Sequence, residues 1–148
     1  SAAATRHAFG KGSVYVVGFY PGMEYASDLL REGYDMSKDI KDDKRGFVSA
    51  AALAAGVKPV VDASHPLVEG VMLKNPKTGK LAVILMNWAY KGSEFVPLDN
   101  ISIRLRGAGE VKKIKSTWSQ QAVSFEKQGG DVLVKLPKVE EGDILLFE

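Results

Sequence analysis

The sequence places residue types that could carry out hydrolysis in one short segment, Asp62-Ala-Ser-His65. A serine nucleophile needs a histidine base and a carboxylate close to it in space. Such triads are assembled from distant parts of a chain, and the sequence has no Gly-x-Ser-x-Gly elbow. Asp62 and Ser64 are also common turn residues, and Pro66 begins the next predicted strand. We therefore interpret this segment as a turn.

Glu69 is the single acid of most interest, because it interrupts the apolar stretch from Leu67 to Leu73. Glycoside hydrolysis requires a second carboxylate facing the first across the sugar. No pattern places another acid beside Glu69, and the acids that flank Gly142 indicate a hairpin turn. We interpret Glu69 as a strand residue that faces solvent or pairs with a base on a neighbouring strand.

The sequence predicts no metal site and no cofactor. It has no cysteine and two histidines, His7 and His65, whereas a metal site needs several convergent ligands. The acids between residues 39 and 43 lack the glycine and the closing glutamate of a calcium loop.

Three aromatic residues near strand ends are candidates for sugar binding. Flat rings of Trp88, Tyr90 and Trp118 could stack on a pyranose if they were exposed. The alternative is core packing, which we favour for both tryptophans, because Trp88 extends an apolar strand and Trp118 shares a face with Ile114. Tyr90 is open between the two interpretations. With Glu69, these residues are the candidate ligand-binding set.

The balance of charge argues against nucleic acid as a partner. The 148 residues carry 20 basic and 18 acidic side chains, a formal net charge of +2. Nucleic-acid binding favours a strong basic excess. One basic stretch, formed by Lys112, Lys113 and Lys115 with Arg104 and Arg106, is predicted to lie on two adjacent strands as a solvated face.

Neither a membrane span nor a signal peptide is predicted. The longest apolar runs, such as Leu81–Met86, are far shorter than the ~18–20 residues that cross a bilayer. The first residue is not Met, so we expect a processed product or an excised piece of a longer chain. Lack of cysteine does not identify the compartment, because secreted bacterial proteins often lack disulfides; a secreted or periplasmic parent protein is favoured.

Residues 1–56 predict a short α/β segment. The β-branched and aromatic run Val14–Val17 suits a strand buried on both faces. A helix is predicted from Met23 to Arg31, a solvated charged loop over residues 31–46, and a second helix over residues 49–55, with Ser49 as N-cap and Gly56 as C′ residue. One strand is too little for a sheet, so we interpret this segment as the remnant of an α/β domain. Its strand edge could pair with another copy of the chain.

From Val57 onward the pattern predicts strands. They are expected near residues 58–62, 67–74, 80–88, 100–106, 111–118, 121–127, 131–136 and 143–148. The strand from Leu81 to Trp88 is apolar on both faces and should be central. Eight short strands with frequent turns predict a mainly β fold: an antiparallel, immunoglobulin-like two-sheet sandwich over residues 57–148.

The run of residues 9–25, FGKGSVYVVGFYPGMEY, resembles the closing strand-turn-helix of class I glutamine amidotransferase-like domains. Such domains accompany bacterial glycoside hydrolases of the beta-galactosidase type, where they have a trimerisation role. Residues 57–148 resemble the β-sandwich that ends such proteins, through PLVEGVML at residues 66–73, LAVILMNW at residues 81–88 and the closing EGDILLF. The resemblance implies a noncatalytic C-terminal portion of a larger carbohydrate-active or uncharacterised protein. Most of an amidotransferase-like domain is absent, including any cysteine nucleophile, so no catalytic residue is carried over.

Three functions are compatible with the sequence. The preferred one is a noncatalytic accessory β-sandwich that packs against other domains of a larger bacterial protein or forms a homo-oligomer through its N-terminal strand. The second is a carbohydrate-binding module that takes a polysaccharide on Tyr90, Trp88 or Trp118. The third is an enzyme built around Glu69, or around Asp62 and His65.

Overall fold

The computed structural model describes residues 3–27, 33–40 and 42–148. The chain divides into two compact units, one of residues 1–34 and 39–58, the other of residues 35–38 and 59–148. We call them the small unit and the sandwich unit. In the described residues, no helix is long and apolar enough to cross a membrane.

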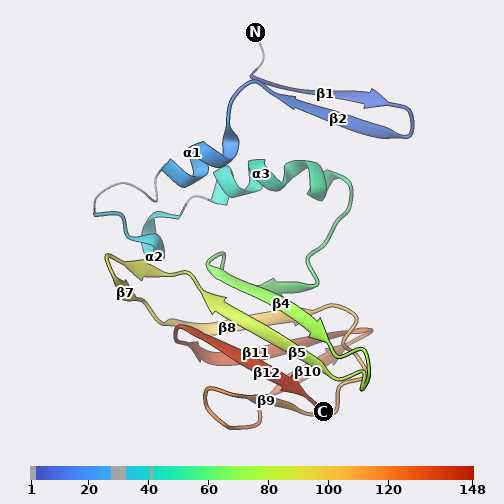
Figure 1. Ribbon diagram of the computed structural model, residues 1–148, viewed down its shortest axis with the longest axis vertical. Coiled ribbons are helices and arrows are strands. Elements are labelled where there is room, and N and C mark those ends of the chain that lie inside the picture. The colour runs from blue at the N-terminus through green and yellow to red at the C-terminus, as the bar shows by residue number, and fades with distance from the viewer. Residues whose placement is uncertain (1–2, 28–32, 41) are drawn as a thin grey trace. The chain divides into compact units, whose positions relative to one another are not determined.

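The sandwich unit contains two four-stranded antiparallel sheets (Figure 1). We name each sheet by a central strand. The β8 sheet has the order β10-β11-β8-β3, with β10 at Phe125–Gln128, β11 at Asp131–Val139, β8 at Leu98–Leu105 and β3 at Val61–Ala63. The β5 sheet has the order β4-β5-β12-β9, with β4 at Val68–Lys74, β5 at Leu81–Asn87, β12 at Gly142–Phe147 and β9 at Ile114–Ser116. The mainly β, two-sheet fold predicted from the sequence is confirmed.

Each of the eight predicted strands exists, and β5 is central as expected, between β4 and β12. A two-stranded ribbon of β6 (Tyr90–Lys91) and β7 (Glu94–Phe95) was not predicted. Residues 36–38 of a short helix, α2 (Met36–Asp39), also belong to the sandwich unit, and Asp35 before it forms an isolated bridge with Lys91 of the ribbon.

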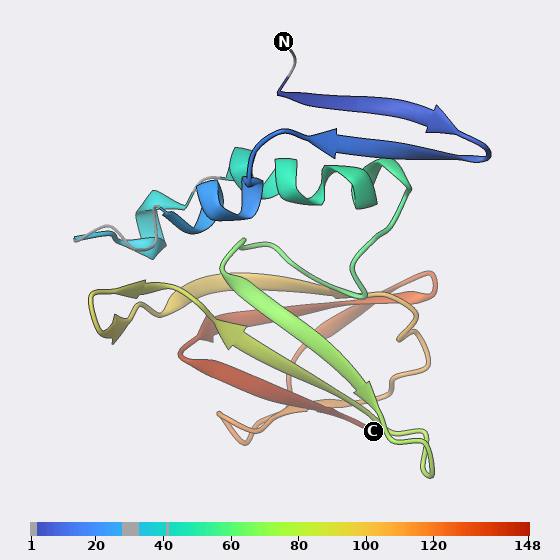
Figure 2. The ribbon, with the colours of Figure 1, turned by 45° about the horizontal axis from the view of Figure 1, so that its top comes forward.

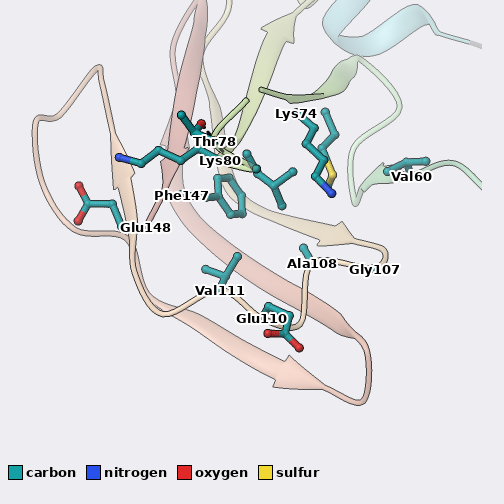
Figure 3. A pocket seen from close by; sticks show the side chains of 13 residues that line it. Val60, Lys74, Thr78, Lys80, Gly107, Ala108, Glu110, Val111, Phe147 and Glu148 are labelled. Atoms are coloured by element: carbon teal, nitrogen blue, oxygen red, sulfur yellow. Dashed lines mark hydrogen bonds between the residues drawn. The ribbon is translucent and has the colours of Figure 1, made fainter. Parts of the chain in front are cut away.

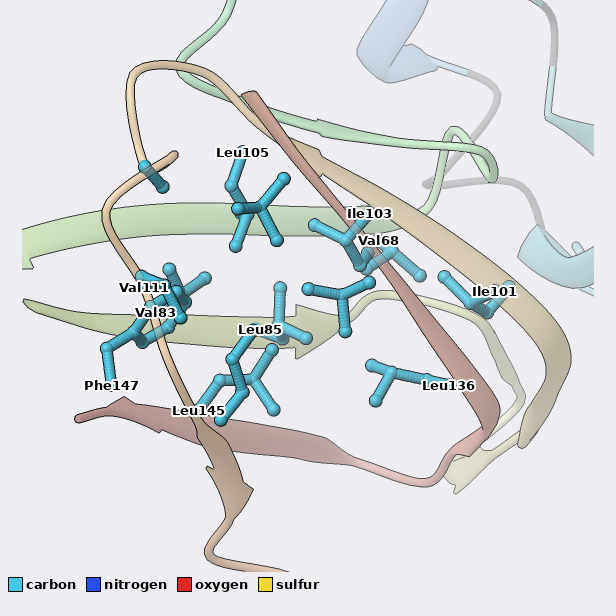
Figure 4. Close-up of a cluster of buried hydrophobic side chains, with 14 of the residues drawn as sticks. Val68, Val83, Leu85, Ile101, Ile103, Leu105, Val111, Leu136, Leu145 and Phe147 are labelled. Atoms are coloured by element: carbon cyan, nitrogen blue, oxygen red, sulfur yellow. The ribbon is translucent and has the colours of Figure 1, made fainter. Parts of the chain in front are cut away.

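The core lies between the two sheets and follows the period-two alternation of the strands. In β8, Ile101, Ile103 and Leu105 are buried, while Ser102 and Arg104 alternate with them on the outer side. Figure 4 shows these three side chains directed toward Val83 and Leu85 of β5. Val83, Leu85, Ile103 and Leu105 are each at most 1% exposed.

One buried amide connects the end of β5 to two other segments. Asn87 is 2% exposed, and its Nδ2 donates to the carbonyl oxygens of Val96 (2.9 Å) and Glu140 (2.6 Å). Its Oδ1 accepts from the backbone N–H of Ala89 at 2.8 Å. A buried polar group must be hydrogen-bonded, so Asn87 fixes the path of the chain as it leaves the sheet.

In its described residues, the small unit contains a hairpin and the helices α1 and α3 (Figure 2). β1 (Ala4–Phe9) pairs with β2 (Gly12–Val17), so His7 lies in a strand rather than in a frayed terminus. The prediction that Val14–Val17 is buried on both faces is wrong, because Val14 is 46% and Val16 59% exposed. A β-branched run predicts extended backbone, but it does not determine whether another layer covers the strand.

The helices differ from the prediction in their bounds. α1 spans Pro21–Ser27, and the rest of the helix predicted as far as Arg31 lies outside the described residues. The loop predicted over residues 31–46 is wrong in part, because α2 lies within it and α3 spans Asp42–Ala54. Ser49 is therefore inside a helix, where its Oγ donates to the carbonyl of Arg45 at 3.0 Å, and is not an N-cap. Gly56 ends α3 with φ +76°, as predicted.

Gly142 is predicted to be required where β12 meets β5. A Cβ at this position would lie 2.5 Å from the carbonyl oxygen of Leu85, which cannot move without shifting the central strand. Gly142→Ala should lower the free energy of unfolding by about 2 kcal/mol, measured by urea denaturation. Gly130→Ala is the matched control, because no heavy atom lies within 4 Å of its Cβ. Equal stabilities of the two variants would contradict the close approach.

Candidate functional site

Glu69 and Trp88, two of the predicted ligand-binding residues, lie in direct contact. Glu69 lies on the outer side of β4, and Trp88 immediately follows β5. The Trp88 backbone N–H donates to the carbonyl of Leu67 at 2.8 Å, and its indole Nε1 donates to Oε2 of Glu69 at 2.9 Å. The carboxylate therefore fixes the orientation of an indole ring that is 47% exposed.

Trp118 is 62% exposed, so the favoured interpretation of both tryptophans as core residues is wrong. The predicted strand over residues 111–118 ends at Ser116, after which the chain turns and the alternation with Ile114 is lost. Asp143 holds this turn: Oδ1 accepts from the backbone N–H of Trp118 at 3.0 Å, and Oδ2 accepts from Oγ of Ser116 at 2.6 Å. Trp118 is thus an exposed ring on an ordered loop.

Tyr90 is half-buried in the β6–β7 ribbon, where it is the strand partner of Phe95. It belongs to a separate two-stranded sheet, whereas Glu69 is in the β5 sheet. The four candidate residues therefore lie in four places: in β4, directly after β5, in β6 and in the loop after β9. The hydrogen bond between Glu69 and Trp88 is the contact that joins two of them.

The three residues considered for nucleophilic catalysis each make a structural contact. Asp62 is ion-paired with Arg106 at 2.7 Å. Oγ of Ser64 accepts from the backbone N–H of Ser102 at 3.0 Å, and Nδ1 of His65 accepts from the N–H of Leu67 at 3.2 Å. The interpretation of the segment as a turn is correct for Ser64 and His65 and wrong for Asp62, which lies in β3 opposite Arg104.

The predicted basic stretch does not form one surface. Arg104 lies on β8 and Lys115 on β9, and these strands belong to different sheets. Arg104 and Arg106 are both near the carboxylate of Asp131, at 3.8 and 3.6 Å. The prediction that the two strands are adjacent is therefore wrong, because strand adjacency is not encoded in local spacing.

A pocket of about 550 Å³ at one end of the sandwich unit was not predicted (Figure 3). Apolar side chains, among them Met72, Leu81, Val111 and Phe147, form much of its lining, and charged groups contribute the rest. The complete lining is Val60, Met72, Lys74, Thr78, Gly79, Lys80, Leu81, Gly107, Ala108, Glu110, Val111, Phe147 and Glu148. The volume is in the usual range for small-ligand sites, and the lining suits an apolar molecule with a polar end.

The pocket is built from segments that are far apart in the sequence, which explains why no motif indicated it. Figure 3 shows the Phe147 ring among side chains of the β4–β5 hairpin and of the loop around Val111. Of the segments that line the pocket, the β4–β5 hairpin was predicted from its turn residues. Gly79 in that turn has φ +70°, a value that favours glycine. Within the described residues, no group of three or more His, Asp or Glu could hold a metal ion.

Comparison with solved structures gives a likeness in fold. No family model matches the sequence, and no curated protein matches it. The solved structure of alpha-L-fucosidase isoenzyme 2 from Paenibacillus thiaminolyticus resembles this chain, with a TM-score of 0.63 and 14% sequence identity. The likeness covers 93% of this chain but only 21% of that one. The chain therefore has the fold of about one fifth of a bacterial glycoside hydrolase.

Removal of the Glu69 carboxylate should release the Trp88 indole. In Glu69→Ala, we expect the Trp88 indole N–H signal in a ¹H–¹⁵N NMR spectrum to shift toward the position of a solvent-bonded indole. The Trp118 signal should stay, and the free energy of unfolding should fall by no more than about 1 kcal/mol, since one exposed hydrogen bond is lost. Glu126→Ala, on the other sheet, is the control. An unmoved Trp88 signal would show that the hydrogen bond does not persist in solution.

Proposed function

We propose that this chain is a noncatalytic accessory part of a larger bacterial, carbohydrate-related protein and that it packs against other parts of that protein. The supporting observation is the likeness that spans 93% of this chain and 21% of an alpha-L-fucosidase. At 14% identity the likeness concerns the fold, so the carbohydrate-related role is part of the proposal. The resemblance of residues 9–25 to the end of an amidotransferase-like domain, with its trimerisation role, supports the same assignment.

The contacts of the candidate catalytic residues support a noncatalytic role. A general base must reach the proton that it removes, whereas Asp62 is already ion-paired with Arg106 and Nδ1 of His65 accepts a backbone N–H. Glu69 is hydrogen-bonded to Trp88. Each of these side chains makes a contact that holds the fold or orients a neighbour, and such structural contacts are expected in an accessory domain.

We expect the isolated chain to release no nitrophenol from a panel of aryl glycosides that includes the α-L-fucoside. The physical reason is that its candidate acids and histidine are engaged in separate structural contacts. Absorbance of released nitrophenol is the measurement. Turnover that is abolished in Glu69→Gln or His65→Gln, but retained in Glu126→Gln, would overturn the noncatalytic assignment.

The exposed tryptophans favour a second candidate function, the binding of a polysaccharide. An indole held by a carboxylate and half exposed, as Trp88 is, loses little conformational entropy when a sugar ring stacks on it. Trp118 offers a second exposed ring, and Tyr90 is the third candidate. In this alternative, Glu69 would both orient Trp88 and accept hydrogen bonds from sugar hydroxyl groups.

Affinity gel electrophoresis tests the second candidate. If it is correct, a retarding polysaccharide should slow the chain, and Trp88→Ala should reduce the association constant at least about tenfold. The association constants of Trp118→Ala and Tyr90→Ala then show how much each of the other two rings contributes to binding. Tyr20→Ala is a matched control, because Tyr20 is 81% exposed in the small unit. Unchanged mobility in every polysaccharide tested would exclude this function for those glycans.

A further inference from the structure

The outward side of the β5 sheet is apolar across three strands. Rows of strand partners place Leu73 beside Ala82 and Leu146, and Val71 beside Ile84 and Ile144. Met86 lies in the next row, between Glu69 and Gly142. We call this surface, formed by Val71, Leu73, Ile84, Met86, Ile144 and Leu146, the outer apolar face. Its side chains alternate with the core residues, so they are not part of the core.

Several of these side chains are exposed to a degree unusual for their type. Val71 is 42%, Leu73 50% and Leu146 42% exposed. Single exposed apolar residues need no explanation, but a contiguous apolar patch marks an interaction surface. The register makes this patch contiguous, because its members are direct neighbours on adjacent strands.

The other sheet provides an internal comparison. One row of its outward side runs from Glu126 through Leu133 and Arg104 to Asp62. Lys135 is ion-paired with Glu126 and lowers the pKa of that carboxyl group below its usual range, chiefly through a hydrogen bond. A charged outward side is normal for an antiparallel sheet that faces water. The outward side of the β8 sheet is therefore largely charged, whereas the outward side of the β5 sheet is apolar.

We propose that the outer apolar face is the docking surface for another folded domain of the same polypeptide, one that presents an aliphatic surface. This inference rests on the proposed function, since it requires a larger protein, and it adds the surface and the chemistry of the partner. The likeness to 21% of a longer chain motivates a partner within one polypeptide. Aliphatic side chains offer no hydrogen-bond partners to sugar hydroxyl groups, so a glycan does not suit this face.

The size of the face favours an attached domain over a second free copy. Three strands of six or seven residues, at about 3.3 Å per residue and about 4.8 Å apart, give a face of roughly 330 Å². A stable complex of free proteins buries about 800 Å² per partner. Interfaces between domains of one chain begin at about 300 Å² per side, because the linker supplies a high effective concentration.

Oxidation of Met86 is the test, because this methionine lies on the outer apolar face. The 148-residue chain and the complete polypeptide encoded with it are treated with peroxide, and sulfoxide formation is followed by mass spectrometry. We expect Met86 to be oxidised at least about tenfold more slowly in the complete polypeptide. Met36, which belongs to the sandwich unit and is 6% exposed, should react slowly in both and reports that this unit is folded.

A pair of variants of the complete polypeptide locates the contact. Ile84→Lys introduces a charge into the outer apolar face and should restore the oxidation rate of Met86 to that of the chain alone. Leu133→Lys makes the same kind of change on the outward side of the β8 sheet and should leave Met86 protected. Continued protection of Met36 shows that neither variant has unfolded the sandwich unit.

Every other outcome has a definite meaning. Equal Met86 rates in both proteins would overturn the docking surface and leave the accessory function standing. Protection already present in the chain alone would also overturn it, because the cover would then lie within this chain or, if sedimentation shows a dimer, on a second copy. A gene that encodes no longer polypeptide would reject the proposed function itself.

Discussion

The structure depends on one constraint, the burial of the inner side of β5 between the two sheets. Its residues alternate between two sides with period two, and both sides are apolar: Val83 and Leu85 on one, Ile84 and Met86 on the other. Burial of the first pair against the β8 sheet makes the sandwich. Ile84 and Met86 on the second side are half-buried, so the sandwich covers the two apolar sides of this strand unequally.

The close fit around β5 follows from the same constraint. β12 lies so near it that Gly142 leaves no room for a side chain beside the Leu85 carbonyl. At the end of the strand, the side-chain amide of Asn87 adds to the backbone ladder by donating to the carbonyl groups of two other segments. The next residue, Trp88, is thereby directed to the surface, where Glu69 fixes its ring. The position of the candidate sugar site is thus a consequence of how the central strand ends.

Local patterns in the sequence were sufficient for the strands of the two four-stranded sheets, but they missed β1, β6 and β7 and did not predict which strands pair. Alternation correctly predicted that Ile101 and Ile103 face the core and that Arg104 does not. Alternation failed for Trp118, because a turn after Ser116 interrupts the period. The β-branched run at Val14 predicted a strand correctly, but extended backbone does not determine whether another layer buries that strand. The contact between Glu69 and Trp88 depends on the register of β4 against β5, and the pocket near Phe147 depends on four separated segments. Neither is a local property.

The two candidate interactions of the β5 sheet differ in chemistry and can therefore coexist. The outer apolar face is aliphatic and can pack against an apolar surface of another domain. The Trp88–Glu69 pair at its end instead combines a flat ring with a carboxylate. A sugar needs both stacking and hydrogen bonds, which the pair supplies and the aliphatic rows do not. A domain that covered only the rows through Val71 and Leu73 would leave the Trp88 indole exposed next to the edge of the interface. The rim of such an interface is where a polysaccharide could contact both this chain and its neighbour.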